Sequence, residues 1–189
     1  MSRALAVTPN RKRGPFQVKR IFTTLDAAAI SGLELKIVQN LIDKKVVILE
    51  RSGGGRRSPR FLSRHHLLCL RLDYYLTSNL SVPKRARLYR ELEERPGLEN
   101  YSVNPVVHLD VAWVRRDVDA RIADLDEAIS TLGANRQDPT FPHTQIKVYD
   151  TVRLLELGLD PQDIISEYTL TERQLYLARL WVVAHPHKN

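Results

Sequence analysis

From Phe22 onward the pattern of apolar and polar residues predicts two short helices in close succession, the first alanine-rich and the second with one apolar face. The first begins after an N-cap at Thr23 or Thr24 and ends at Gly32. The second runs from about Glu34 to Lys44. Its apolar face is formed by Ile37, Val38, Leu41 and Ile42.

The next stretch changes from helical spacing to a short β-branched run. Residues 46–51, VVILER, predict a strand, and residues 59–63, PRFLS, predict its antiparallel return. The glycine-rich stretch RSGGGRRSPR, Arg51 to Arg60, would connect them as the tip of a hairpin. Ser63 is a good N-cap for a third helix, RHHLLCLRLDYYL. The predicted order is helix, helix, hairpin, helix.

Further along, Ser81-Val82-Pro83 predicts the start of a charged helix that ends at Pro96-Gly97, and residues 101–110 predict an extended connection or a short strand. A helix of about 20 residues follows and ends at Gly133. Its apolar stripe, with steps of three and four, either faces the core or joins two copies of the chain as in a coiled coil. The candidate dimer residues are Val114, Val118, Ile122, Leu125 and Ile129.

A proline-containing segment, residues 135–144, predicts a boundary before three short helices. These helices cover about 148–157, 160–168 and the residues after an N-cap at Thr171. We therefore expect a mainly α protein with four parts: a flexible basic arm (1–20), a winged helix-turn-helix (21–76), a helical linker with a possible dimer contact (77–134) and a small all-helical unit (135–189).

Charge is divided unequally between the two ends of the chain. The net charge is +7, but residues 1–76 hold 15 Lys and Arg against 5 Asp and Glu, whereas residues 77–189 hold 14 against 17. A positive potential confined to one part favours a polyanionic partner, nucleic acid above all. The single cysteine, the lack of a signal-peptide pattern and the lack of a long uncharged apolar run lead us to expect a cytoplasmic protein with no membrane contact.

Catalytic and metal-binding patterns find little support. The stretch 53–58, GGGRRS, lacks the lysine and the spacing of a phosphate-binding Walker loop. His65 and His66 are adjacent and point to different sides of a helix, and Cys69 lies among leucines. We therefore expect no enzymatic activity, no cofactor and no metal site.

The nucleic-acid hypothesis uses geometry as well as charge. In a helix-turn-helix, the second helix enters the major groove, and its outward side chains read base edges or contact phosphates. Asn and Gln can bind adenine and Lys can reach guanine or phosphate, so Lys36, Gln39 and Asn40 are the candidate reading residues. Phosphate contacts are expected from Arg56, Arg57, Arg60 and Arg64. The arm around Arg11–Arg13 could enter a neighbouring minor groove.

Residues 22–72 resemble the winged helix-turn-helix domain of MerR-type regulators. The similarity lies in a short helix, a glycine turn, a recognition helix, a wing, and an Arg-aromatic-x-Ser sequence, here Arg60-Phe61-Leu62-Ser63, that opens the next helix. The resemblance implies a DNA-binding fold.

Residues 143–181, HTQIKVYDTVRLLELGLDPQDIISEYTLTERQLYLARLW, are similar to the small antitoxin domain catalogued as domain of unknown function four hundred thirty-three. The matching positions are Thr144, Ile146, Val148, Gly158, Pro161, Ile164, Tyr168, Leu170 and Thr171. A wing-bearing domain followed by this unit looks like a VapB-type antitoxin. That resemblance implies operator DNA and a PIN-type ribonuclease toxin as partners.

Two alternatives stay open at the level of sequence. One is a MerR-like transcription regulator without a toxin partner, which keeps the DNA-binding half and reassigns the other. The second is a protein–protein adaptor, whose basic half would meet an acidic protein instead of DNA.

Overall fold

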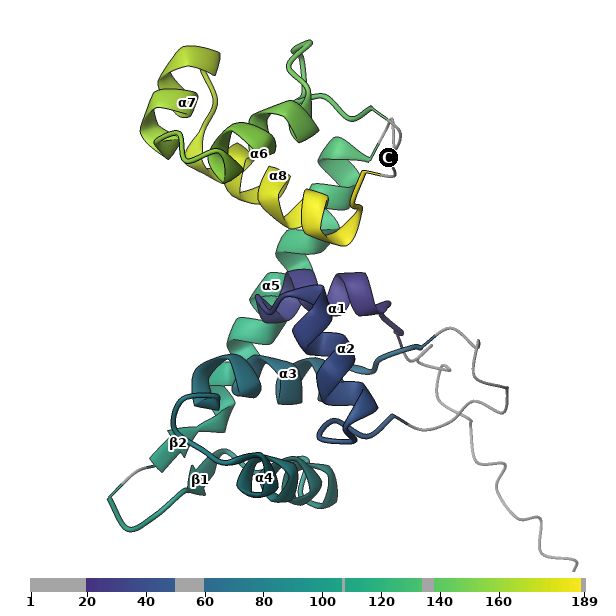
Figure 1. Ribbon diagram of the computed structural model, residues 1–189, viewed down its shortest axis with the longest axis vertical. Helices are drawn as coiled ribbons and strands as arrows, with labels where there is room; N and C mark the ends of the chain where they lie inside the picture. The colour runs from purple at the N-terminus through teal and green to yellow at the C-terminus, as the bar shows by residue number, and fades with distance from the viewer. Residues whose placement is uncertain (1–19, 50–59, 107, 134–137, 188–189) are drawn as a thin grey trace, which may run out of the picture.

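The computed structural model describes residues 20–49, 60–106, 108–133 and 138–187. These residues form a mainly helical protein with a small two-stranded antiparallel sheet (Figure 1). The helices are α1 (Thr24–Ser31), α2 (Leu35–Asp43), α3 (Arg64–Leu76), α4 (Val82–Glu94), α5 (Val111–Leu132), α6 (Val148–Glu156), α7 (Pro161–Tyr168) and α8 (Glu172–Ala184). The strands are β1 (Asn100–Ser102) and β2 (His108–Asp110).

Helix ends follow the capping residues of the sequence. Thr23 and Asp26 form a reciprocal capping box at the start of α1, and Thr171 does the same with Gln174 at α8. Helix α1 ends at Gly32, which has φ of 76°, a conformation that glycine adopts without steric cost. The helices predicted from spacing and caps are therefore confirmed.

The predicted strand at residues 46–51 is wrong for its described part, because residues 46–49 form no strand. Lys45 adopts a positive φ of 53°, and the amides of Val46 and Val47 both donate to the carbonyl of Leu41 at 2.9 and 3.2 Å. The backbone thus closes the end of α2, and both valines are buried. The return segment forms an isolated bridge in which Leu62 pairs with Phe22. The rest of the expected hairpin, residues 50–59, lies outside the described residues.

Where the sequence predicted an extended connection or one short strand within residues 101–110, the structure has two short strands that form a hairpin. Strands β1 and β2 pair antiparallel, with Tyr101 opposite Leu109, and the hairpin leads directly into α5. Asp110 caps α5 by accepting a hydrogen bond from the backbone N–H of Trp113 at 2.7 Å.

Helix α5 extends from the hairpin toward α6 and α8 (Figure 1). Its side chains contribute to two clusters of buried residues. The first cluster joins α1 to α4 with the first part of α5, and the second joins the end of α5 with α6 and α8. Helix α8 packs on both α1 and α5, so that Leu180 and Ala184 belong to the first cluster while Trp181 belongs to the second. The segment expected to be a linker therefore contributes α4 and much of a core.

The apolar stripe of α5 faces this core. Val114, Val118 and Leu125 are 2%, 1% and 1% exposed. Ile122 and Ile129 are partly buried and pack against the same cluster. The candidate dimer residues are thus covered by the chain's own helices, which is the core-facing alternative of the two that the stripe allows. A contact between two copies through this stripe would require the chain to give up part of its core.

Candidate nucleic-acid interface

The end of α1 is fixed by two arginines from other helices. Arg71 of α3 donates to the carbonyl of Ser31 at 2.9 Å and to the carboxylate of Asp117 at 2.6 Å. Arg121 of α5 donates to the carbonyls of Ile30 and Ala29 at 2.5 and 2.9 Å. The last carbonyls of a helix have no partner within the helix, so these guanidinium groups satisfy them and hold α1 against α3 and α5.

Helix α2 follows α1 after three residues, 32–34, so the anchoring of α1 also determines where α2 begins. The buried side of α2 is formed by Val38 and Leu41, and Leu35 and Ile42 pack against the same core. With one face held by these contacts, the opposite face must point away from the protein.

Lys36, Gln39 and Asn40 occupy that outward face, and all three are exposed. In the part of the chain that the structure describes, none of the three side chains takes part in a hydrogen bond or an ion pair. Their amide and ammonium groups are therefore available to a ligand, and Ile37 adds an apolar side chain that is 39% exposed beside them.

The two described arginines expected at phosphates both have acidic partners. Arg60 forms an ion pair with Asp43, at the last residue of α2, over 2.7 Å, and the two side chains are 43% and 57% exposed. Arg64 forms an ion pair with Asp119 of α5. Arg60 thus lies next to the end of α2, as a contact beside the second helix requires, whereas Arg64 is directed to α5.

The remaining predicted contacts cannot be placed. Arg56 and Arg57, and residues 1–19 of the expected arm, lie outside the described residues. Arg20, the last residue assigned to the arm, is anchored: its guanidinium pairs with Asp126 of α5 at 2.5 Å and lies 4.8 Å from the ring centroid of Phe22.

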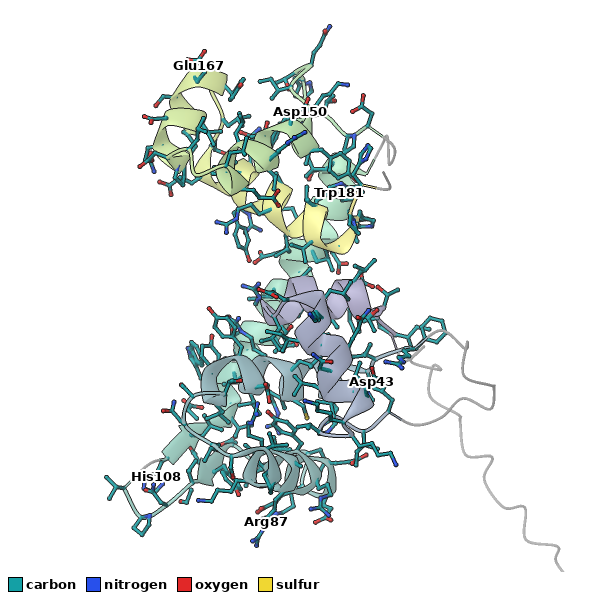
Figure 2. The ribbon with its side chains drawn as sticks, viewed as in Figure 1. Asp43, Arg87, His108, Asp150, Glu167 and Trp181 are labelled. Carbon is teal, nitrogen blue, oxygen red and sulfur yellow. The ribbon has the colours of Figure 1, made fainter. Side chains whose placement is uncertain are left out.

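Further exposed cations were missed by the sequence interpretation. Lys44 and Lys45 continue the basic surface past the end of α2. On α4, Lys84, Arg87 and Arg90 are exposed at three-residue steps and so share one side of the helix, with Arg87 directed away from the body of the protein (Figure 2). The three-residue spacing of these cations is the signal in the sequence that indicates such a basic side.

The cysteine and a nearby tyrosine belong to the core between α3 and α4. Burial raises the pKa of the Cys69 thiol, and the carboxylates of Glu93 and Asp73 add to the shift. Burial also raises the pKa of Tyr89, whose hydroxyl donates to Asp73 at 2.9 Å. A thiol kept protonated in this way is a poor nucleophile, so Cys69 acts as a packing residue.

Comparison with known proteins gives no family to which the chain can be assigned: no protein-family model matches it, and no curated protein matches it. Within the described ranges, no helix is long and apolar enough to cross a membrane. The same residues contain no group of three or more His, Cys, Asp or Glu side chains placed to hold a metal ion.

Proposed function

We propose that the chain is the DNA-binding antitoxin of a type II toxin–antitoxin system, which binds its own operator through α2 and neutralises a PIN-type ribonuclease through its C-terminal half. The observation that carries the DNA-binding part is the exposed, unpartnered polar face of α2, on a helix joined to a firmly anchored α1 by three residues. Two helices joined by a short glycine-containing turn, with a polar second helix, are the elements of a helix-turn-helix.

Charge supports a polyanionic partner for the same region. Exposed cations on α2 and α4, with the residues that directly follow α2, outnumber those of the helices α6 and α7. They are Lys36, Lys44, Lys45, Lys84, Arg87 and Arg90. Cations of this kind give sequence-independent attraction to phosphates, and the amides of Gln39 and Asn40 supply groups that distinguish bases.

Binding to DNA from upstream of the chain's own reading frame, measured by fluorescence anisotropy at graded salt, tests this part. We expect the triple variant Lys36→Ala, Gln39→Ala, Asn40→Ala to lose the difference between operator and unrelated DNA, because base contacts carry that difference. Arg153→Ala removes one exposed cation from α6 and is the matched control. Equal discrimination by the triple variant and the wild type would remove α2 from the proposal.

The ion pair between Arg60 and Asp43 gives a second test, in which two variants should change the affinity for DNA in opposite directions. An exposed pair is worth about 0–1 kcal/mol, so Arg60 can leave Asp43 for a phosphate at small cost. Asp43→Asn, which frees the guanidinium and removes a negative charge beside α2, should tighten DNA binding, and Arg60→Ala should weaken it. If both variants change the affinity for DNA in the same direction, a phosphate contact at Arg60 is contradicted.

The antitoxin part rests on the resemblance of residues 143–181 and needs its own experiment. Co-expression with the neighbouring reading frame, followed by copurification and a ribonuclease assay, should yield a complex in which cleavage is suppressed. If no complex forms while operator binding is intact, the regulator without a toxin is the correct alternative.

A further inference from the structure

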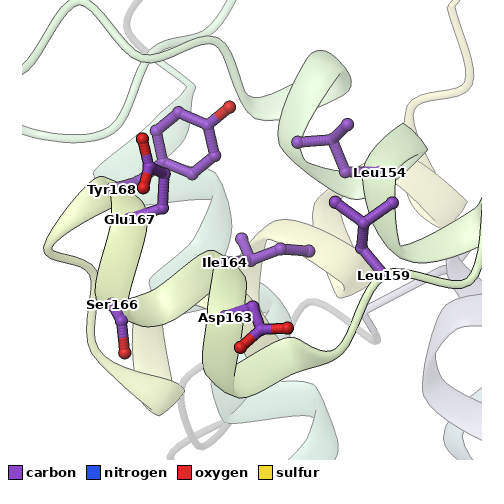
Figure 3. A pocket seen from close by; sticks show the side chains of 7 residues that line it. All are labelled: Leu154, Leu159, Asp163, Ile164, Ser166, Glu167 and Tyr168. Carbon is purple, nitrogen blue, oxygen red and sulfur yellow. The ribbon is translucent and has the colours of Figure 1, made fainter.

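An open groove lies between α6 and α7, at the end of the molecule far from α4 (Figures 1 and 3). It has a volume of about 620 Å³. Leu154 and Leu159 line one side, Ile164 forms part of the floor, and Tyr168 lies across from the leucines (Figure 3). The groove therefore presents a mainly apolar surface that these two short helices leave uncovered.

Two leucines in and next to the α6–α7 connection are exposed. Leu157, at the end of α6, is 69% exposed, and Leu159, in the connection to α7, is 45% exposed. A single exposed leucine is common, but Leu159 is exposed and also lines the groove, so that it adds apolar surface where a partner could bind.

Carboxylates border the same groove. Asp163 and Glu167 line the groove four residues apart on α7, and neither makes an ion pair in the part of the chain that the structure describes. Residues 148–172 contain six Asp and Glu but only one cation, Arg153. The groove lining therefore carries two carboxylates and no cation, in contrast to the exposed cations of α2 and α4.

These features decide the chemistry of the occupant. Carboxylates repel nucleic acid and other phosphate ligands, and the groove lining contains no Lys, Arg or His that would bind an anion. Residues four apart on a helix lie about 5–6 Å from each other, so Asp163 and Glu167 form a row. A helix of a partner protein fits both features if it carries Lys or Arg four residues apart opposite Asp163 and Glu167 and has leucine-like side chains on the adjoining face for the apolar groove.

We propose that the α6–α7 groove binds a cationic amphipathic helix of a partner protein. The proposal deepens the partner-binding half of the proposed function and rests on it, because it names the surface by which the antitoxin would hold its toxin. The apolar groove supplies contact area, while Asp163 and Glu167 orient the partner helix and exclude acidic ones.

A synthetic peptide probe tests the groove without any toxin. The full chain is titrated with a fluorescent 14-residue peptide of leucine and lysine in amphipathic helical order, and with a permuted peptide of the same composition that has no apolar face. We expect the ordered peptide to bind and the double variant Asp163→Lys, Glu167→Lys to weaken it at least about tenfold. Glu93→Lys, Glu94→Lys makes the same charge change on α4 and is the matched control.

Two further variants keep the test informative if charge reversal disturbs α7. Asp163→Asn, Glu167→Gln removes the charges with little change in shape, and Leu159→Ser alters an exposed position; each should weaken the ordered peptide several-fold. The proposal is overturned if the permuted peptide binds as tightly as the ordered one, or if the α4 control loses as much affinity as the α7 double variant. Either result would indicate non-specific attraction between charges. A concentration-dependent dimer that the α7 variant abolishes would also overturn the proposal, because the occupant would then be a second copy.

Copurification with the neighbouring reading frame separates this proposal from the proposed function. A complex that survives Asp163→Lys, Glu167→Lys keeps the antitoxin function and overturns the groove as its toxin site. No complex with the wild type, together with specific peptide binding, keeps the groove and overturns the antitoxin function. If the wild type copurifies with the toxin and the α7 double variant does not, the antitoxin function and the groove as its toxin site are both supported.

Discussion

Arg85 and Asp73 form an ion pair between α4 and α3 whose side chains are only 8% and 1% exposed. The Tyr89 hydroxyl donates to the same carboxylate at 2.9 Å, and Arg85 also donates to the Thr77 hydroxyl at 3.2 Å. Removing one member of a buried pair leaves the other charge without a counter-charge. We therefore expect Asp73→Ala to lower the free energy of unfolding by about 3–5 kcal/mol.

Urea denaturation followed by far-UV circular dichroism measures this effect. The comparison is Arg64→Ala, which breaks the exposed pair with Asp119 and should cost less than about 1 kcal/mol. Similar costs for the two variants would show that burial does not set the energy of the Arg85–Asp73 pair.

The same core makes stability sensitive to alkaline pH. Cys69 and Tyr89 are 1% and 4% exposed, and burial raises the pKa of both groups above their ordinary values of 9.0 and 10.0. The unfolded chain therefore loses these protons at a pH at which the folded chain keeps them. Stability therefore falls as pH rises above about 9, by about 1.4 kcal/mol per pH unit from Cys69, and above about pH 10 by a similar further amount per unit from Tyr89.

Urea midpoints measured between pH 7 and pH 11 should show this decline. Cys69→Ala removes one of the two ionisations, so its stability should fall less steeply with pH than that of the wild type, whatever its absolute stability. Identical slopes would mean that the Cys69 thiol is as easily ionised in the folded chain as in the unfolded one.

The turn between α1 and α2 depends on Gly32. Its φ of 76° is unfavourable for other residues, and a Cβ atom there would lie 3.1 Å from Nη1 of Arg71, the side chain that caps α1. We expect Gly32→Ala to cost about 1–2 kcal/mol in urea denaturation.

Because α2 starts from this turn, the Gly32→Ala variant should also weaken operator binding. Gly97→Ala is the control, since no atom lies within 4 Å of the added Cβ and no positive φ is imposed. A loss of stability in Gly97→Ala as large as that in Gly32→Ala would refute the role assigned to the turn.

Helix boundaries could be predicted from sequence because they depend on nearby residues. The capping box at Thr23 and the stop at Gly32 involve side chains within a few positions of the backbone groups they serve. The strand at residues 46–51 was predicted wrongly because β-branched residues also fill a core: Val46 and Val47 are buried at the end of α2 without any strand partner.

Contacts between distant segments could not be predicted in this way. Arg121 lies 91 residues from Ile30, and no local pattern indicates that its guanidinium caps α1. The exposed face of α2, in contrast, was correctly expected from the helical spacing of Lys36, Gln39 and Asn40. The groove between α6 and α7 depends on how two short helices meet, which their separate sequences do not specify.

For the whole molecule, the charged surfaces lie far apart. Arg87 on α4 and Glu167 on α7 mark opposite ends of its long axis (Figure 2). A polyanion on α2 and α4 and a cationic protein on α7 would meet different parts of the molecule, so that the two proposed partners need not compete for the same surface.

The two clusters of buried side chains should nevertheless unfold together. Helix α8 places Leu180 in the first cluster and Trp181 in the second, and α5 runs through both. The chain's two tryptophans report on the two clusters separately. Trp181 belongs to the second cluster, whereas Trp113 lies beside the first, with its ring centroid 5.5 Å from that of Tyr75. In Trp113→Phe and in Trp181→Phe, we expect the urea midpoint from the remaining tryptophan's fluorescence to equal that from circular dichroism.

Leu180→Ala sharpens this prediction, because the side chain is 5% exposed and belongs to α8 but packs in the first cluster. Added to each single-tryptophan background, it should destabilise the chain by about 2–5 kcal/mol and shift both fluorescence midpoints equally. Leu157→Ala, at a position 69% exposed, should shift neither. A shift confined to the Trp181 signal would mean that the C-terminal helices unfold alone, and the boundary expected near residue 135 would then separate two independent units.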